Sequence, residues 1–178
     1  KGIPLSHSNI GANASGLSKA WGFTRHDVLL HALPMFHAHG LLIALNCTLI
    51  RGSAVRYLRR FDPEAVIVAL VDASVIMGLP TFYTRLLSSK RLDKNCCHVI
   101  RLFISGSAPL RTDTFDAFAA RTGHHIVERY GMSETVVLTS NPIDGARKAG
   151  TVGVPLPGIA VRVTDANNRP LPSGDIGR

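Results

Sequence analysis

The sequence predicts an α/β fold, a mostly parallel sheet flanked by helices on both faces. Short, mostly apolar segments alternate along the chain with segments of about ten residues that have a helical pattern. Several of the apolar segments lack a polar side, as is typical of strands that are covered on both faces of a parallel sheet. With 46% hydrophobic and 18% charged residues among 178, the composition excludes a disordered tail.

The helices are predicted from caps and breakers. Ser6 or Ser8 can cap a first helix that continues through Trp21. Asp62 and Pro63 form a helix start, with a capping carboxylate before a proline at the first helical position. The run 40–50 is apolar nearly all round and is expected to be a buried helix. The expected helices are, in order, 6 or 8 to 21, 40–50, 63–72, 81–88 and 112–121, with approximate ends.

The strands are predicted from apolar or alternating runs that lie between those helices. Pro34 ends the first strand, and a polar, cationic connection over 89–98 suits the surface. The expected strands are 28–33, 53–58, 75–78, 101–104, 126–129, 136–140 and 160–163. In such sheets, ligands bind beyond the carboxyl ends of the strands. The loops after Leu33, Gly78, Ser105 and Arg129 are therefore the expected location of the chemistry.

The first candidate segment is 34–40, with His37 and His39 separated by one residue. A metal site would need further ligands, and no Cys, Asp or Glu lies nearby in the sequence. A packed or capping histidine is one alternative. The other is an imidazole at a strand's carboxyl end that contacts a carboxylate or a phosphate.

The second segment is 104–110, whose small residues follow a strand: Gly106, Ser107, Ala108 and Pro109. Such a loop lets the backbone approach a flat or charged ligand, and its amides can bind an anion. The same composition also forms an ordinary tight turn.

The third segment is 128–135. Tyr130 offers a ring for stacking, Ser133 a hydroxyl for phosphate, and Glu134 a hard oxygen ligand for Mg²⁺. A capped helix start after a strand would explain the same residues. No glycine-rich run of the Rossmann or Walker type is present.

Arg85 lies on a helix that is otherwise dominated by apolar side chains and follows a strand end. From base rates alone, the Arg85 side chain is expected to be solvated, because long cationic side chains are mostly exposed. If Arg85 points inward, it must pair with an anion.

Charge and cysteine content narrow the function classes. The net charge of +8 makes anionic partners plausible, but the basic residues are dispersed and aromatics are 6%, which argues against a nucleic-acid-binding module. Cys47, Cys96 and Cys97 fit neither a disulfide framework nor a zinc site, which favours a reducing, cytoplasmic compartment. No run is long and apolar enough to span a membrane, so no membrane partner is expected.

Together the three segments resemble the adenylate-forming superfamily of acyl-CoA synthetases, luciferases and peptide-synthetase adenylation domains. Lys1-Gly2 is similar to the tail of its phosphate loop, 36–40 to its histidine gate, 105–110 to its adenine-side loop, 130–135 to its signature motif, and 173–177 to a later turn. Within the superfamily, the runs 79–85, 128–132 and 150–158 are most similar to malonyl-CoA synthetases. Ser133 departs from the usual threonine but keeps the hydroxyl.

The resemblance implies roles for these residues. His39 would orient the reacting carboxylate, Ser133 would contact phosphate, and Glu134 would hold Mg²⁺. Arg85 with Ser107 would anchor a second carboxylate, which favours an inward Arg85. The implied nucleotide site is Gly106, Ser107, Ala108, Pro109, Glu128, Arg129, Tyr130, Gly131, Met132 and Ser133, with Tyr130 stacked on adenine. The implied substrate site is His39, Arg85, Ser107 and Met132.

The implied reaction is ATP-dependent ligation of malonate or methylmalonate to coenzyme A through an acyl-adenylate. A monocarboxylic acid is the alternative substrate. Malonate and methylmalonate differ by one methyl group, which is worth only about 1–3 kcal/mol of discrimination in a pocket, so the sequence does not choose between them. The chain is expected to be a fragment, 1–178, of the N-terminal ATP- and acyl-binding domain. Most of the phosphate loop would precede it and a C-terminal domain with the catalytic lysine would follow, so the segment alone would be inactive. The oligomeric state is not indicated.

Overall fold

The computed structural model describes residues 2–178 and contains one seven-stranded sheet in the order β2-β1-β3-β4-β5-β6-β7. The strands are β1 (Val28–His31), β2 (Ala54–Tyr57), β3 (Val75–Gly78), β4 (Leu102–Ser105), β5 (Val127–Met132), β6 (Val136–Ser140) and β7 (Val154–Pro155). The first five pair in parallel, and β6 and β7 add antiparallel to β5. The predicted mostly parallel α/β fold is confirmed.

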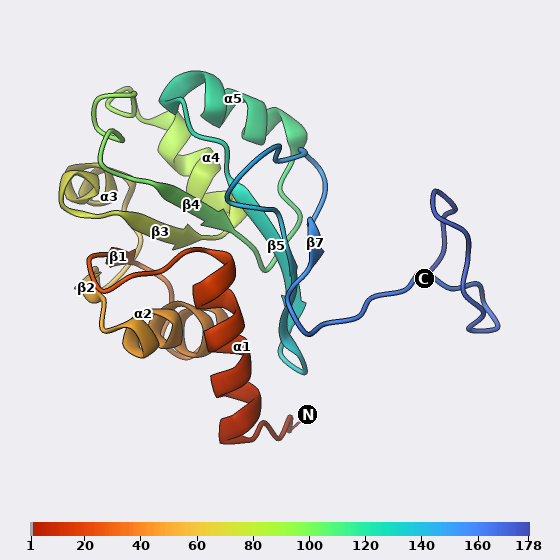
Figure 1. Cartoon of the computed structure of the whole chain (residues 1–178). Helices are drawn as coiled ribbons and strands as arrows, with labels where there is room; N and C mark the ends of the chain where they lie inside the picture. The colour runs from red at the N-terminus through yellow and green to blue at the C-terminus, as the bar shows by residue number, and fades with distance from the viewer. Residues whose placement is uncertain (1) are drawn as a thin grey trace.

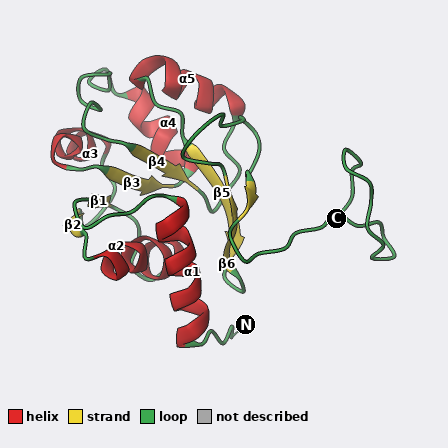
Figure 2. Cartoon of the chain, viewed as in Figure 1, coloured by secondary structure: helices red, strands yellow, loops and turns green. Residues whose placement is uncertain are grey.

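Helices cover both faces of this sheet, as Figures 1 and 2 show. They are α1 (His7–Ala20), the π-helix η1 (His39–Leu45), α2 (Asn46–Arg51), α3 (Pro63–Ala69), the 3-10 turn η2 (Leu70–Asp72), α4 (Pro80–Ser88) and α5 (Thr112–Thr122). α3, α4 and α5 lie on one face, and α1 and α2 lie on the other. Parallel strands that are buried on both sides need such covering layers. No helix in the described part of the chain is long and apolar enough to cross a membrane.

The predicted caps set the helix ends. The Ser6 hydroxyl accepts a hydrogen bond from the Asn9 amide at 3.1 Å, and α1 ends at Ala20 with Trp21 as its C-cap. The Asp62 carboxylate accepts from the Ala65 amide at 2.9 Å at the start of α3. Each of these bonds satisfies one of the free amides in the first helical turn.

Aromatic side chains fill the layer between the sheet and the helices α4 and α5. Tyr83, Phe103 and Phe118 are fully buried and pack edge to face, with ring centroids 4.9 to 6.5 Å apart. The Tyr83 hydroxyl donates to the Ile104 carbonyl at 2.6 Å, so the one polar atom of this cluster is satisfied. These contacts fix α4 and α5 against β4.

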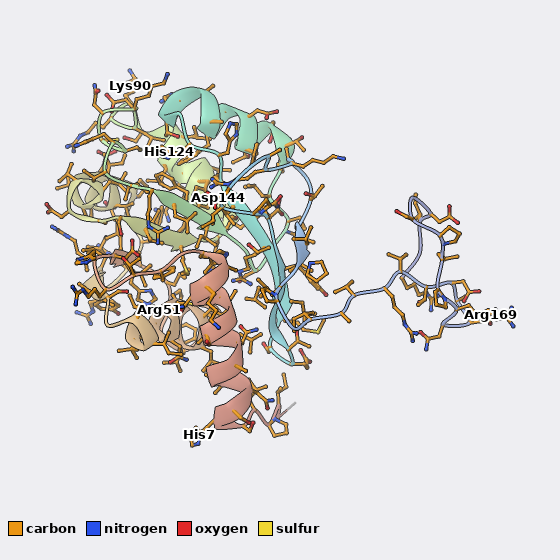
Figure 3. All side chains as sticks on the ribbon, viewed as in Figure 1. His7, Arg51, Lys90, His124, Asp144 and Arg169 are labelled. Carbon is orange, nitrogen blue, oxygen red and sulfur yellow. The ribbon has the colours of Figure 1, made fainter. Side chains whose placement is uncertain are left out.

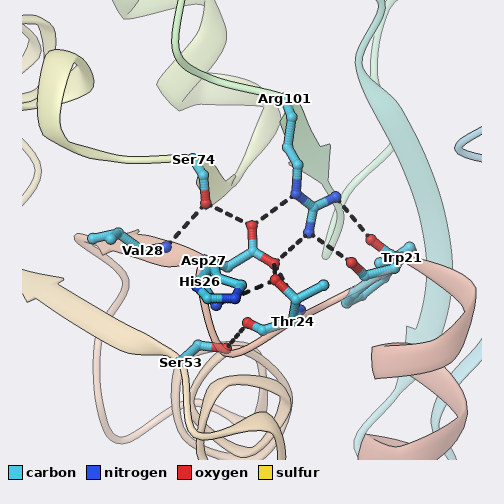
Figure 4. Close-up of polar contacts among 9 residues, drawn as sticks. Trp21, Thr24, His26, Asp27, Val28, Ser53, Ser74 and Arg101 are labelled. Carbon is cyan, nitrogen blue, oxygen red and sulfur yellow. Dashed lines mark hydrogen bonds and ion pairs between the residues drawn. The ribbon is translucent and has the colours of Figure 1, made fainter.

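A polar network ties together the amino ends of three strands (Figure 4). Asp27 precedes β1, Ser74 precedes β3 and Arg101 precedes β4. The Arg101 guanidinium donates to both carboxylate oxygens of Asp27, at 2.7 and 2.9 Å, and the Ser74 hydroxyl donates to the same carboxylate at 2.7 Å. This network holds the edge of the sheet opposite to the predicted ligand loops.

Two expected elements need correction. The run 40–50 forms two helices, η1 and α2, and is only partly buried, because Leu41, Leu49 and Ile50 are exposed. The predicted strand 160–163 is wrong: the C-terminal segment leaves the sheet (Figure 1), and next to this run it forms only an isolated bridge between Thr164 and Pro170. A two-residue strand, β7, forms earlier instead.

The connection 89–98 lies at the surface as predicted, and Lys90 projects outward in Figure 3. Leu92 and Cys97 within it are nevertheless buried. These two side chains fasten the connection to the core while its cationic residues stay in solvent.

Candidate functional site

The three predicted segments come together at the carboxyl edge of the sheet, where they line two adjacent cavities. The histidine cavity, about 350 Å³, is lined by His37, Ala38, His39, Ile43, Ser107, Arg129, Gly131, Met132, Ser133, Glu134 and Val136. The tyrosine cavity, about 310 Å³, is lined by Ser107, Ala108, Pro109, Leu110, Glu128, Arg129, Tyr130, Gly131, Gly150 and Val152. Both are lined by Ser107, Arg129 and Gly131, which therefore lie at their boundary.

The third segment is a β-hairpin. β5 and β6 are joined by a tight turn in which the Thr135 amide donates to the Met132 carbonyl at 3.2 Å. This corrects the alternative of a helix start. Ser133 and Glu134 occupy the two central positions of the turn, so both side chains are exposed at its tip and line the histidine cavity.

The base of this hairpin requires a glycine. The register between β5 and β6 shifts at Tyr130 and Gly131, and a Cβ on Gly131 would overlap the backbone of Val136. Val136 itself has φ 59°, a conformation that is strained for a β-branched residue. Because the Gly131 and Val136 backbones approach each other directly across the hairpin, their contact fixes the direction in which the turn points.

The loop that contains Ser107 contacts the histidine directly. Ser107 has φ 71°, unusual for a residue other than glycine, and its Oγ lies 3.2 Å from His39 Nδ1. Strained backbone of this kind costs about 1–3 kcal/mol and is concentrated at functional sites. The bond joins the first and second predicted segments across the cavity.

His39 is the first residue of η1 and is only 5% exposed. Burial, together with the positive charge of Arg129, lowers its pKa well below 6.5, so the imidazole is neutral at pH 7. Its Nε2 has no hydrogen-bond partner among residues 2–178. A neutral, buried imidazole with one open nitrogen can bind a carboxylate or phosphate oxygen once that nitrogen carries the proton.

Glu128 and Arg129 are neighbours on β5 and differ in what they contact. A Glu128 carboxylate oxygen accepts a hydrogen bond from the Leu110 amide at 2.9 Å, which fastens the 106–110 loop to the strand. Burial raises the pKa of Glu128. The Arg129 side chain lies against Gly106, where a Cβ would overlap the guanidinium. Glycine at position 106 is therefore what gives this arginine its space.

Tyr130 and Met132 have side chains open to solvent on either side of this boundary. Tyr130 is 45% exposed and lines the tyrosine cavity, whereas Met132 is 43% exposed and lines the histidine cavity. Ala108 and Pro109 also line the tyrosine cavity. A cavity lined by an aromatic ring and small side chains suits a flat heterocycle.

Arg85 does not join the other predicted site residues. It is exposed, lines neither cavity, and its guanidinium lies 4.9 Å from the centre of the Phe61 ring. In this structure Arg85 does not point into either cavity, because α4 turns Phe82, Tyr83 and Leu86 toward the core and leaves Arg85 beside that face; its role toward a substrate stays a prediction. Arg85 and Ser107, expected to anchor a second carboxylate together, do not line a common cavity, since Ser107 lines both cavities and Arg85 lines neither.

The residues do not form a metal site by themselves. Nowhere among residues 2–178 do three His, Cys, Asp or Glu side chains gather in a way that could hold a metal ion. Glu134 supplies a single carboxylate at the mouth of the histidine cavity. That donor set fits Mg²⁺ only as a shared ion, since Mg²⁺ is often bound by one or two carboxylates together with substrate phosphates. The expected phosphate-loop residue Lys1 lies outside the described residues.

Comparison with known proteins identifies the family. A family model described as AMP-binding enzyme matches residues 1–178. The chain belongs to the AMP-binding enzyme family. Its relatives in this family include the malonate–CoA ligase of Arabidopsis thaliana, 35% identical over 99% of this chain, and the mitochondrial malonate–CoA ligase of Homo sapiens, 36% identical over 94%.

Solved structures of the family superpose closely on the chain. ATP-bound MatB from Rhodopseudomonas palustris is 52% identical with a TM-score of 0.98, covering 99% of this chain and 35% of MatB. A malonyl-CoA ligase complex with methylmalonyl-CoA and AMP is 40% identical with a TM-score of 0.87, covering 92% and 36%. The chain also spans about a third of the curated relatives, 32% of each ligase named above.

Proposed function

We propose that this chain is the nucleotide- and acyl-binding part of an AMP-forming ligase that joins a small dicarboxylic acid, malonate or methylmalonate, to coenzyme A. The observation that carries the proposal is the pair of adjacent cavities. One offers a tyrosine ring and a loop of small residues, and the other a buried neutral imidazole and an open guanidinium. The named malonate–CoA ligases and the malonyl-CoA ligase structure support it.

The reaction has two displacements. An oxygen of the substrate carboxylate attacks the α-phosphorus of ATP and pyrophosphate leaves. The thiol of coenzyme A then attacks the acyl carbonyl of the adenylate and AMP leaves. Both steps depend mainly on alignment and charge neutralisation, so a rigid boundary between two cavities suits them.

Each residue has a role that follows from the cavity that it lines. Adenine binds in the tyrosine cavity, between the Tyr130 ring and the 106–108 loop. The carboxylate binds in the histidine cavity, where His39 aligns it toward the nucleotide. At the mouth of that cavity, Ser133 would contact phosphate, and Glu134 would help to hold Mg²⁺, which would offset phosphate charge. Elements of the full-length protein beyond this chain complete the site.

A monocarboxylic substrate is the second candidate, because a benzoate CoA ligase from Burkholderia xenovorans is 30% identical with a TM-score of 0.88. The two candidates differ in the charge that they bring into the acyl site. Only a dicarboxylate supplies a second anion that remains after the first carboxylate has reacted.

The test is acid-dependent exchange of labelled pyrophosphate into ATP by the full-length protein. Malonate, methylmalonate, acetate and butyrate are compared, each with and without Mg²⁺. We expect Mg²⁺-dependent exchange with malonate or methylmalonate well above that with acetate or butyrate. Exchange with none of the four acids would contradict the ligase proposal, and a preference for butyrate would favour the monocarboxylate candidate.

A further inference from the structure

The tyrosine cavity has three walls, and each comes from a different part of the chain. Strand β5 forms one, the loop 107–110 forms the second, and Gly150 with Val152 forms the third. The hydrogen bond from the Leu110 amide to the Glu128 carboxylate, at 2.9 Å, ties the second wall to the first. The third wall belongs to the irregular loop between β6 and β7, so no strand ladder holds it.

The side chain of Asn141 supplies the missing link. Asn141 follows β6 and is 4% exposed. Its Nδ2 donates to the Thr151 carbonyl at 2.6 Å and to the Glu128 carbonyl at 3.2 Å. Its Oδ1 accepts from the Lys148 amide at a longer distance, 3.4 Å. One buried amide therefore joins β5 to the loop that forms the third wall.

The backbone that carries this amide is itself held firmly. The Asn141 amide donates to the Glu128 carbonyl at 2.9 Å, and the Asn141 carbonyl accepts from the Ser140 hydroxyl at 2.9 Å. The Ser140 hydroxyl in turn accepts from Trp21 Nε1 at 2.9 Å. Gly153 packs so closely that a Cβ there would overlap the backbone of Ser140 and Asn141. A side chain on so rigid a base can fix a loop, because little of its own freedom remains to be lost.

Asn141 has no direct access to a ligand in either cavity. It lines neither of them, whereas Gly150 and Val152, on both sides of its partner Thr151, line the tyrosine cavity. Any effect of Asn141 on a bound molecule must therefore pass through these two residues. Neither of them lines the histidine cavity, so such an effect should be confined to the tyrosine cavity.

We propose that Asn141 is a positioning residue for the nucleotide, because it fixes the loop 148–152 as a wall of the tyrosine cavity. The inference rests on the proposed function, which puts adenine in that cavity. A wall that is already fixed binds a flat ring without first being ordered. A loose wall would have to be ordered when the nucleotide binds, and the entropy lost would weaken binding.

The test compares Asn141→Ala and Asn167→Ala in the full-length protein. Asn167 is exposed, lies outside both cavities and is the matched control. For Asn141→Ala we expect the Kd for AMP, measured by calorimetry, to rise about fivefold or more, the effect of one lost hydrogen bond. The KM for malonate and kcat at saturating ATP, from pyrophosphate exchange, should stay within about twofold, since the histidine cavity is not changed. The control should match wild type in all three quantities.

Asn141→Asp separates hydrogen bonding from the filling of space. The two side chains have almost the same shape, but an ionised aspartate has no donor for the Thr151 and Glu128 carbonyls. We expect the Kd for AMP to rise at least as much as in Asn141→Ala. A wild-type Kd for AMP in the aspartate variant would overturn the proposal.

The outcomes for the inference and for the proposed function are distinct. If wild type binds AMP but exchanges pyrophosphate with none of the acids, the ligase proposal fails, while the AMP affinities still decide the role of Asn141. An unchanged Kd for AMP in Asn141→Ala overturns the inference. An equal rise in the Kd for AMP and the KM for malonate would show a general loosening of the fold, which also overturns it.

Hydrogen exchange of the wild type covers the case in which the Asn141 variants fail to fold. AMP should slow exchange of the 148–152 amides at least about threefold, because the loop is a wall of the occupied cavity. The amides of 165–169, outside both cavities, should keep their rates. Unchanged exchange in 148–152 with AMP bound would overturn the proposal.

Discussion

Replacing Asp27 with asparagine tests the network that holds the amino edge of the sheet. The carboxylate is 4% exposed and accepts hydrogen bonds from Arg101, from the Ser74 hydroxyl and from the Thr24 amide at 2.8 Å. These bonds outweigh the opposing effect of burial and lower the pKa of Asp27 from 3.8 to about 2. The ionised form is therefore bound more tightly in the folded state than in the unfolded state.

The pKa gives the size of the effect. The difference between 3.8 and about 2, at about 1.36 kcal/mol per pH unit, is worth somewhat more than 2 kcal/mol of stability. Arg101 is 35% exposed, so solvent screens part of this and we expect about 2 kcal/mol. Because the folded pKa is depressed, this stabilisation is complete above about pH 4 and is lost as the pH falls toward 2.

The assay is urea unfolding of the chain, followed by circular dichroism, at neutral pH and near pH 2. Asp27→Asn should unfold at lower urea at neutral pH, with a loss of about 2 kcal/mol, and the loss should shrink at the acidic pH. Asp116→Asn, at an exposed position of α5, is the matched control and should change little at either pH. An equal loss for Asp27→Asn at both pH values would refute the electrostatic account, as would an equal loss in the control.

Three further predictions concern the site in the full-length protein. Glu134→Gln keeps the shape of the hairpin tip but removes the charge proposed for Mg²⁺, so exchange should fall at least about tenfold while the urea midpoint of unfolding is unchanged; wild-type exchange would contradict the role. His39→Ala should lower kcat for adenylation more than it weakens ATP binding, since the alignment of the substrate carboxylate is lost. In the wild type, protonation of His39 should cause no loss of exchange near pH 6.5, because its pKa lies well below that value. Gly131→Ala should destabilise the chain by about 2 kcal/mol or more, because the new methyl would overlap the Val136 backbone. The control is Gly145→Ala, at a glycine with open space but φ 92°, which should cost about 1 kcal/mol from backbone strain alone. Equal urea midpoints for the two variants would refute the packing argument.

Local signals were sufficient to predict most elements. The caps at Ser6 and Asp62 act through bonds within a few residues, so the sequence contains all that decides them. A strand also needs a neighbour, which a local pattern does not specify. That is why 160–163 alternates without pairing, while the two residues of β7 do pair with β6.

The convergence of the three segments could also be predicted, because loops after parallel strands share one edge of the sheet. The side of a helix that faces that edge could not be predicted. The pattern of α4 shows that Phe82 and Leu86 are buried, but a flanking position such as 85 can face either the ligand or solvent, and the structure places Arg85 in solvent.

The burial of the Arg129 side chain could not be predicted either, for a similar reason. On a strand with one exposed face, alternation would tell which of Glu128 and Arg129 points inward. The start of β5 is buried on both faces, so both side chains are enclosed and the alternation disappears. The deciding feature is distant in sequence: Gly106 follows β4 and leaves the space that the guanidinium occupies. The open donors of Arg129 therefore follow from contacts between distant segments, which no local pattern in the sequence specifies.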